Sequence, residues 1–308
     1  MTPRVVIATD EFGWHGRRLA DAFARLGVET AAVTTRDFRV QVGGAGDAAV
    51  PALAAAPAAF DAVFVRGVPG GTLEQVCLRM ECLHELAARG VPVVNPPRTI
   101  ELTVNKAATS MRLAAARLPM PETWCGESLD AALAFARAQL AAGGEVVYKP
   151  LFGSQGEGLA RFASEADLTR LEHGPGVYYL QRFHGPPTGP YRDYRLFVVA
   201  GEVVGAMERV SDHWVTNRAQ GGLCRPLTVT GELRDLAQRA AVSVGADYLG
   251  VDILPAPEGL LVTEVNSIPA WQGLQRVCQV DIAARLAALT LAVCRDAGAA
   301  RAGLSVLP

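Results

Sequence analysis

The sequence has little lysine, no long apolar run and no excess of either charge. Its 308 residues include 29 basic side chains against 31 acidic ones, and only Lys106 and Lys149 are lysines. This near-neutral balance argues against a dedicated nucleic-acid or membrane-surface protein, whose sign is a basic excess. The apolar stretches are interrupted within about a dozen residues by Arg, Asp, Gly or Pro, and are too short to span a bilayer.

The cysteines and the first residues exclude further classes. The six cysteines form no CxxC pair and stand at no zinc-finger spacing from a histidine, so we expect reduced thiols instead of a disulfide framework or a zinc site. Residues 1–8 lack a cleavage site and predict a strand, not a signal peptide. We therefore expect a cytoplasmic protein.

Half of the residues are hydrophobic, and the length predicts about two domains or three small ones. Strand and helix patterns alternate up to residue 94, with strands at 5–9, 28–34, 61–66 and 91–94 and helices at 17–26 and 73–89. This order predicts a parallel sheet wrapped by helices. Asn95-Pro96-Pro97 marks a first boundary, and the Pro/Gly-rich stretch 185–190 marks a second.

A strand at 145–149 delivers Lys149 to a loop with three glycines, Gly153, Gly156 and Gly158, and a returning strand follows at 159–162. Glycines allow backbone N–H groups to approach phosphate oxygens, and lysine supplies the opposite charge. The order is neither that of a Walker loop nor that of a Rossmann fingerprint. The pattern indicates either a flap over the phosphates of a nucleotide or an ordinary glycine-rich hairpin.

Two carboxylates and an amide occupy a predicted hairpin over residues 248–266. If Leu254 faces Leu260, Asp252 faces Val262, and Glu264 and Asn266 lie farther along the same face, while Val251, Ile253, Leu261 and Val265 fill a core on the other face. Clustered oxygen ligands suit Mg²⁺. The alternative is an exposed hairpin with scattered acids.

Arginines and an asparagine follow in a third group. Arg195 and Arg209 stand on predicted strands at 194–200 and 202–208, and Asn217 precedes a pair of glycines. Such side chains can grip carboxylate or phosphoryl oxygens, although a single arginine at a strand end is more often simply solvated.

Taken in this order, these residues resemble the ATP-grasp superfamily and, within it, the RimK-like carboxylate–amine ligases. The match covers nearly the whole chain. The segment Trp214–Gly222 looks like two branches, one that ligates glutamate to tetrahydromethanopterin-type coenzymes and one that acts on a carrier protein in lysine biosynthesis, and Val65–Gly71 is similar to the first of these. Val215 stands where glutathione-synthetase relatives carry arginine, which weakens a glutathione-like substrate.

The resemblance implies an α/β fold, with an N-terminal wrapped parallel sheet (residues 1–95), a central ATP-grasp lid domain (96–184) and a C-terminal domain with the metal site (185–308). It implies that ATP lies between the last two parts. By the same resemblance, the nucleotide is bound by Lys106, Lys149, Ser154, Gln155, Gly156, Gln181, Arg182, Phe183 and Asp193. Arg182 stands where many relatives have glutamate, so an adenosine contact by its side chain is left open.

The same resemblance assigns Asp252, Glu264 and Asn266 to two Mg²⁺ ions, with Mn²⁺ as a possible replacement. It implies that a carboxylate is phosphorylated by ATP and that an amine then displaces the phosphate. Arg195, Arg209 and Asn217 are the expected catalytic residues, which position and neutralise the reacting groups.

Three hypotheses follow for the substrate. The first is ligation of an amino acid, L-glutamate above all, to a small carboxylate such as a pterin coenzyme. The second is modification of a carrier or ribosomal protein, and the third is a non-catalytic ATP-binding protein. We expect no nucleic-acid or membrane partner. Because members of the family often form dimers or tetramers, the resemblance also implies a homo-oligomer.

Four other side chains stand near the ends of predicted strands. Trp14, His15 and Arg66 lie at the edge where open α/β sheets bind ligands. Trp14 and His15 line an acceptor pocket or simply belong to the loop, and Arg66 is a candidate for binding a carboxylate of the acceptor or is an ordinary strand-end residue. His184 is expected to be an exposed loop residue.

Overall fold

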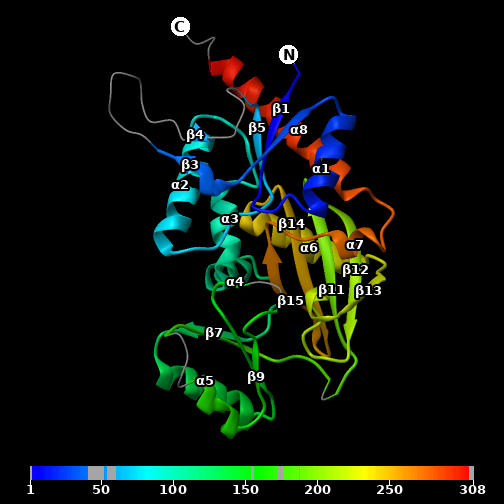
Figure 1. Ribbon diagram of the computed structural model, residues 1–308. Coiled ribbons are helices and arrows are strands. Elements are labelled where there is room, and N and C mark those ends of the chain that lie inside the picture. The colour runs from blue at the N-terminus through cyan, green and yellow to red at the C-terminus, as the bar shows by residue number, and fades with distance from the viewer. Residues whose placement is uncertain are drawn as a thin grey trace.

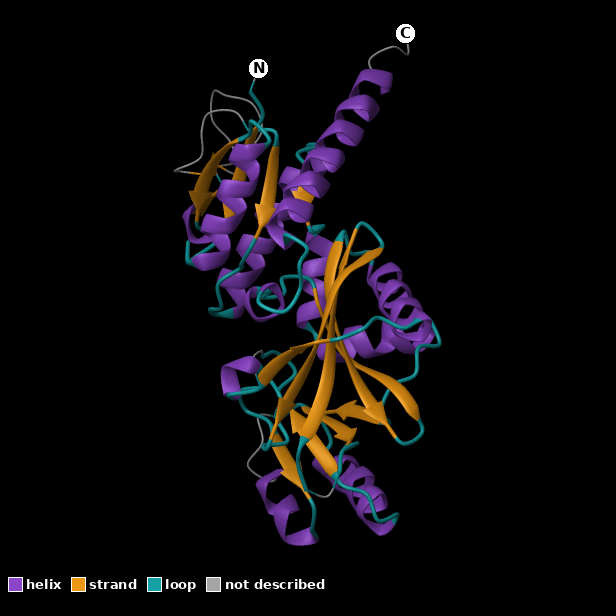
Figure 2. Cartoon of the chain, turned by 90° about the vertical axis from the view of Figure 1, so that its right-hand side faces the viewer, coloured by secondary structure: helices purple, strands orange, loops and turns teal. Residues whose placement is uncertain are grey.

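The computed structural model of the chain describes residues 2–40, 52–53, 60–153, 156–171, 176–186 and 188–304. Three main sheets follow one another along the molecule, with the N-terminal sheet at one end and a small α/β lid at the other (Figure 1). The long strands of the third sheet lie between them (Figure 2). This mixed α/β architecture confirms the predicted fold class.

The N-terminal layer is a parallel sheet with the strand order β2-β1-β5-β6. Its elements are β1 (Arg4–Ala8), α1 (Trp14–Arg25), β2 (Glu29–Val33), β5 (Ala62–Val65), α2 (Leu73–Ala88) and β6 (Val93–Val94). Short elements in the connection after β2 are η1 (Thr35–Asp37), β3 (Phe38–Arg39) and β4 (Ala52–Leu53). The wrapped parallel sheet was predicted from the alternating pattern, and the element ends differ from the prediction by three residues at most.

Helix α1 forms because its apolar residues recur at helical spacing. Leu19, Ala22 and Phe23 are buried on one face against the sheet. Gly27 follows the helix with φ +71°, a left-handed conformation in which glycine avoids the strain of a Cβ atom. The chain can therefore turn back at once into β2.

The lid contains an antiparallel sheet with the order β7-β10-β8-β9. It is preceded by α3 (Pro97–Val104) and α4 (Lys106–Ala115) and comprises β7 (Thr123–Gly126), α5 (Leu129–Ala141), β8 (Val146–Lys149), β9 (Ala160–Phe162), η2 (Glu165–Leu171) and β10 (Tyr178–Arg182). Helix α5 packs on one face of this sheet through Ala132 and Ala136, which are fully buried. The lid thus has a hydrophobic core of its own.

The third sheet is antiparallel, with the order β13-β12-β11-β14-β15. Its elements are β11 (Tyr191–Val199), β12 (Glu202–Ser211), η3 (Arg218–Gln220), β13 (Leu223–Pro226), α6 (Gly231–Val244), β14 (Tyr248–Ala256) and β15 (Gly259–Asn266), followed by α7 (Gln272–Gln275) and α8 (Ile282–Leu304). Leu196, Val198 and Val251 pack against α6 on one face. The other face is shared between the N-terminal layer and the lid.

The C-terminal helix returns to the beginning of the chain. Helix α8 packs beside α1, as Figure 1 shows. Ile282 and Leu286 are fully buried in the same core as Ile7 and Phe23. The last helix therefore completes the hydrophobic core of the first sheet. The domain limits 1–95, 96–184 and 185–308 stay a prediction.

Asn95 ties the N-terminal layer to the third sheet. Its side chain is fully buried, and its Nδ2 donates to the carbonyls of Tyr248 and Ser267 at 2.8 and 2.7 Å. Its Oδ1 accepts from the amides of Asp247 and Tyr248. All the polar atoms of one amide are thus used to fix the first predicted boundary against β14.

In the part of the chain that the structure describes, no helix is both long enough and apolar enough to cross a membrane.

Candidate active site

One face of the third sheet changes from apolar to charged along its strands. Phe197 and Tyr248 on this face are buried against the N-terminal layer. Farther along the same face stand Arg195 on β11 and Asp252 on β14, which are direct cross-strand neighbours. Side chains two residues apart share a face of a strand, so the charged row continues the apolar one. The change occurs where the sheet leaves the N-terminal layer and meets the lid.

A cavity of about 340 Å³ lies between this charged row and the lid. Residues from both parts of the chain line it. Those predicted from the sequence are Lys106, Lys149, Gly156, Gln181, Arg182, Phe183, Asp193, Arg209, Asn217, Asp252 and Glu264. Arg195 and Asn266 are not among the lining residues, and Ser154 and Gln155 lie outside the described residues.

The two lysines of the chain meet in this cavity. Nζ of Lys149, at the end of β8, donates to Oε1 of Gln181 at 2.7 Å. Nζ of Lys106, the first residue of α4, donates to the Gly153 carbonyl at 2.9 Å and lies 4.0 Å from Oε1 of Glu264. Burial lowers the pKa of both ammonium groups, although Glu264 acts against it. Two desolvated cations beside one carboxylate form a site for a further anion.

A β-bulge brings the acidic residues together, in a register different from the predicted one. Leu254 pairs with Leu261 and not with Leu260, and Asp252 lies opposite Glu264 and not opposite Val262. The ladder shifts between Asp252 and Ile253, so Thr263 is the extra residue on β15.

The bulge also explains which apolar residues are buried. Val262 and Val265 both enter the core against α6, although they are three residues apart, which a regular two-residue alternation does not allow. Leu261 is buried, as predicted, but it lies outside the core against α6, where Val262 takes its expected place. The predicted meeting of the two carboxylates holds for a different reason than the one given.

Two arginines hold two aspartates under the cavity. Arg195 makes a bidentate contact with Asp252, with Nη2 at 2.5 Å from Oδ2. Arg209 pairs with Asp193 through both Nε and Nη2, and its Nη2 lies 3.0 Å from Oδ2 of Asp252. These four buried side chains alternate in charge across β11, β12 and β14.

Charge pairing overrides burial in this network. Burial alone would raise the pKa of Asp252, but Arg195 and Arg209 more than offset it and hold the pKa at about 2. Burial would lower the pKa of Arg209, and the two aspartates raise it instead. Both arginines and Asp193 are thus bound to protein groups, whereas they were predicted to face the reacting groups and the ribose.

The predicted hinge segment runs along one wall of the cavity. The amide of Arg182 donates to the Glu122 carbonyl and that of Phe183 to the Glu145 carbonyl, both at 2.8 Å. These two N–H groups are therefore occupied by the protein itself. The ring of Phe183 packs edge-on against Tyr191 and Trp214, which also line the cavity.

His184 is not the exposed loop residue that the sequence suggested. It lines the cavity, and its Nδ1 lies 2.6 Å from Oε1 of Glu258 at the turn between β14 and β15. Burial lowers the pKa of the imidazole, and Glu258 partly opposes this. The contact joins the hinge to the turn that follows the acidic strand.

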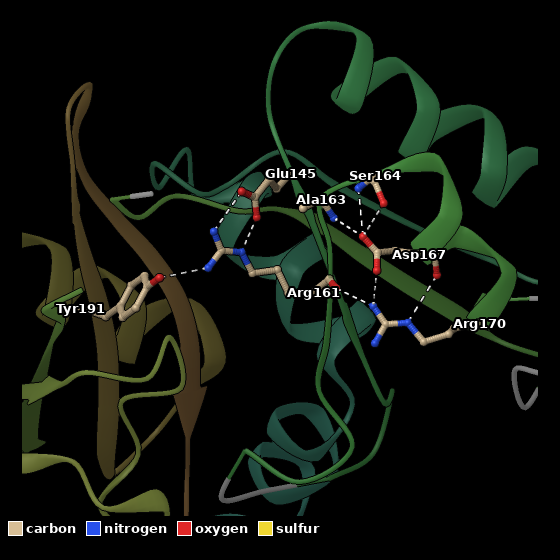
Figure 3. Close-up of polar contacts among 7 residues, drawn as sticks. All are labelled: Glu145, Arg161, Ala163, Ser164, Asp167, Arg170 and Tyr191. Atoms are coloured by element: carbon tan, nitrogen blue, oxygen red, sulfur yellow. Dashed lines mark hydrogen bonds and ion pairs between the residues drawn. The ribbon is translucent and has the colours of Figure 1, made fainter. Parts of the chain in front are cut away.

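Arg161 connects the lid to the third sheet (Figure 3). From β9 it forms a bidentate ion pair with Glu145, and its Nη1 donates to the hydroxyl of Tyr191 on β11 at 3.2 Å. Its guanidinium lies 4.0 Å from the centre of the Phe183 ring. Sequence reasoning did not single out Arg161 or Tyr191, because the contact joins strands that are distant in the chain.

Gly156, in the loop after β8, stands at a position that requires glycine. Gly156 has φ +79°, and a Cβ atom there would lie 2.6 Å from Cγ1 of Val215 and 3.3 Å from Oδ1 of Asn217. The glycine loop therefore closes directly onto the segment that carries Asn217.

The lid sheet lies over a charged antiparallel sheet, and the cavity between them holds two lysines and two carboxylates. This arrangement is that of an ATP-dependent carbon–nitrogen ligase of the ATP-grasp type. The chain belongs to the RimK-like ATP-grasp family, because the family model of that domain matches residues 103–290. It is 41% identical to the tetrahydromethanopterin:alpha-L-glutamate ligase of Methanococcus maripaludis over 229 residues, which cover 72% of this chain and 76% of that protein.

Two further relatives define the range of the likeness. The alpha-aminoadipate–LysW ligase LysX of Saccharolobus solfataricus is 32% identical over 63% of this chain and 72% of its own length. The ATP-grasp ligase PsnB, solved with a precursor peptide variant, Mg and ADP, superposes with a TM-score of 0.72 over 94% of this chain and 98% of its own, at 21% identity. The last likeness concerns the fold.

Proposed function

We propose that this ligase joins L-glutamate, through its amino group, to a carboxylate of a small pterin-like coenzyme. The observation that carries the proposal is the cavity that holds both lysines opposite Asp252 and Glu264, in a chain 41% identical to a tetrahydromethanopterin:alpha-L-glutamate ligase. The sequence identity to that ligase supports the substrate class, and the cavity supports the use of a nucleoside triphosphate.

In this proposal the cavity holds ATP with its phosphates toward the lysines. Lys106 and Lys149 contact the phosphate oxygens, and the loop of Ser154, Gln155 and Gly156 covers them. The adenine lies beside Gln181, Arg182 and Phe183. Because the Arg182 and Phe183 amides are occupied, it is held by carbonyl groups and side chains of the hinge. Asp193 borders the ribose from its pair with Arg209.

The acidic residues suit Mg²⁺. Asp252 and Glu264 face each other across β14 and β15, and Asn266 lies on the same strand as Glu264. Two carboxylates and an amide oxygen form the hard donor set that Mg²⁺ shares with phosphate and water. We propose that these three residues hold two Mg²⁺ ions, which Mn²⁺ can replace. The metal supplies neutralisation of the phosphate charge.

The proposed reaction has two steps. A carboxylate oxygen of the acid attacks the γ-phosphorus of ATP, the bond to ADP breaks, and an acyl phosphate forms. The amine nitrogen then attacks the acyl carbon, the bond to phosphate breaks, and the amine loses a proton as the amide forms. Positioning and charge neutralisation are the main requirements of phosphoryl transfer.

The remaining polar residues serve this chemistry in different ways. Asn217, which lines the cavity next to Gly156, orients the reacting carboxylate or phosphoryl group. Arg195 and Arg209 keep Asp252 ionised and fixed, so they act as positioning residues. We also propose that the enzyme is a homo-oligomer with no nucleic-acid or membrane partner; its cytoplasmic location stays a prediction.

The test is the release of ADP and phosphate from ATP and Mg²⁺, with amino acids tried against pterin-bearing carboxylates. Lys149→Met is the blank, because it removes the buried charge and keeps most of the side-chain volume. Release that needs both an acid and an amine, with a product mass equal to their sum minus water, supports the proposal. Release with glutamate but only in the presence of a carrier protein would favour the second candidate, for which the likeness to LysX speaks. ATP binding without release under either condition would favour a non-catalytic protein.

A further inference from the structure

A second cleft, of about 490 Å³, lies at the carboxyl ends of β1 and β5 in the N-terminal layer. Residues 9–11, 13–15 and 66–69 and Gln272 of α7 contribute to it, and it shares no lining residue with the cavity between the third sheet and the lid. Carboxyl ends of parallel strands are where open α/β sheets bind ligands. The roles proposed above leave this cleft unused.

Arg66 is the residue of this cleft that indicates a bound ligand. It follows β5 and lines the cleft, its side chain is largely buried, and its Nε has no hydrogen-bond partner among the described residues. The guanidinium lies 5.2 Å from the centre of the Trp271 ring, and Nη1 lies 3.5 Å from the Ile268 carbonyl. No carboxylate of the described chain stands within ion-pair distance of it. A buried cation without a counterion is unfavourable, so an anion is the group that fits here.

A second donor stands in the same cleft. Nε2 of His15 accepts a hydrogen bond from the Trp271 amide at 3.2 Å. Burial, then Arg66 and Arg218, lower the pKa of His15 to about 3, so the ring is neutral. In a neutral imidazole whose Nε2 accepts, Nδ1 carries the proton and can donate.

The start of α1 adds to the positive potential. Its N-cap residue, Gly13, has no side chain that could cap the first turn. Uncapped N–H groups at a helix N-terminus favour an anion. They stand beside His15, in the first turn of the same helix.

Acidic residues at the cleft do not neutralise Arg66. Asp10 is paired with Arg36, whose Nε lies 2.9 Å from Oδ2, and it accepts from the Thr34 hydroxyl. Glu11 is exposed and lies beside Gly13 at the rim. The interior of the cleft therefore remains positive, with one carboxylate at its edge.

Short series of hydrogen bonds run from this cleft toward the cavity between the third sheet and the lid. Oδ1 of Asn266 accepts from the Ile268 amide at 2.8 Å, and the Ile268 carbonyl faces Arg66. On the other side, Asn217 lines the cavity, and the next residue, Arg218, donates to Oε1 of Gln272 in the cleft wall at 3.1 Å. Hydrogen bonds of the protein thus link the walls of the two cavities, with Asn217 on one side and Arg66 on the other.

We propose that this cleft binds a substrate carboxylate that the ligation does not consume, with Arg66 and the Nδ1–H of His15 as its donors. The inference rests on the proposed function, because it assigns the cleft to one of the two substrates of that reaction. A free carboxylate is present in both of them: L-glutamate keeps its own carboxylates when its amine reacts, and a coenzyme with two carboxylates keeps one. Arg66 is therefore a specificity-determining residue for an acidic substrate.

The test is isothermal titration of the full-length protein, loaded with Mg²⁺ and a non-hydrolysable ATP analogue. The probes are L-glutamate, L-glutamine and folate, a pterin that carries two carboxylates. Arg66→Met removes the charge, Arg66→Lys keeps it, and Arg234→Met, on the exposed face of α6, is the matched control. We expect Arg66→Met to weaken carboxylate binding about 10- to 100-fold, the range of one charge-assisted contact, with Arg66→Lys intermediate and the control unchanged.

The titrations separate the two sources of the carboxylate. Weakened binding of glutamate, with folate unchanged, assigns the cleft to the amine substrate, and the reverse assigns it to the acid. Affinity for the ATP analogue should stay the same in all variants. Equal affinities of wild type and Arg66→Met for glutamate and for folate, or no binding of either of these two to wild type, would overturn the inference. Because binding is measured without turnover, a ligase that fails in the ADP-release assay can still pass here.

Discussion

Removing Arg209 tests whether the charged network under the cavity supports the third sheet. Its side chain is 4% exposed and neutralises Asp193 and Asp252 at once. Breaking a buried ion pair by removing one partner costs about 3–5 kcal/mol, because the other charge stays buried and unpaired. Arg209→Met leaves two such carboxylates, of which Asp252 keeps Arg195, so we expect a loss of about 4 kcal/mol.

The assay is urea unfolding followed by circular dichroism. With a slope of about 2 kcal/mol per M, the midpoint should fall by about 2 M. The double variant Arg209→Met/Asp193→Asn removes the carboxylate that Arg209→Met leaves bare, so it should recover part of the loss. Arg285→Met, which breaks an exposed pair between α8 and Glu202 of β12, is the control and should cost about 1 kcal/mol at most.

Two results would refute this reasoning. If Arg209→Met lowered stability no more than the control, the network would not bear on the stability of the sheet. If the double variant were less stable than Arg209→Met, the unpaired charge of Asp193 would not be the source of the loss.

Three further changes test other parts of the molecule. Lys106→Met should lower kcat/KM for ATP by about 10²- to 10³-fold while the melting temperature stays the same or rises, because burial lowers the pKa of this ammonium group; a fall in both would indicate a structural role. The pKa of His15 is lowered from 6.5 to about 3, mainly by burial, so the unfolded chain binds the extra proton between these values. The contribution of the neutral ring to stability is therefore fully present above about pH 6.5 and is lost as the pH falls toward 3. His15→Gln should reduce the fall in melting temperature between about pH 7 and about pH 4. The same fall in melting temperature in the variant and in wild type would contradict this. Gly156→Ala places a Cβ atom 2.6 Å from Val215 and should raise KM for ATP about tenfold, whereas Gly201→Ala, with a similar φ but open space, should leave KM as it is.

The sequence predicted the N-terminal layer well because its physics is local. Apolar strands alternate with amphipathic helices there, and each ends at a recognisable residue such as Gly27. The packing of α8 on that layer was not predicted, because no local pattern shows which sheet a C-terminal helix will cover. In the lid, the two strands around the glycine loop followed from the residue pattern, whereas their arrangement as a lid followed from the resemblance.

The acidic hairpin shows where pattern reasoning failed. Two-residue alternation placed Leu261 in the core against α6, whereas the bulge at Thr263 places Val262 there and leaves Leu261 buried outside that core. One signal was present: Val262 and Val265 are both β-branched and three residues apart, which a bulge reconciles and a regular strand does not. A prediction of register needed the cross-strand partners as well as the strand itself.

The charged residues were found, but their partners were not. Asp193 and Arg209 are direct neighbours across β11 and β12, and Arg195 and Asp252 across β11 and β14. We predicted from the sequence that these groups bind substrate. Their pairing with one another depends on the register between strands, which the sequence alone does not give. His184 was misjudged for the same reason, since Glu258 reaches it from another strand pair.

The position of α8 also sets the order in which the molecule can be completed. A ribosome delivers the strands of the first sheet long before it delivers Ile282 and Leu286, which share a core with Phe23. Until those last residues emerge, the apolar side of α1 that faces α8 has no cover. The first sheet is therefore among the last parts of the molecule to close, and removal of α8 would leave its core uncovered.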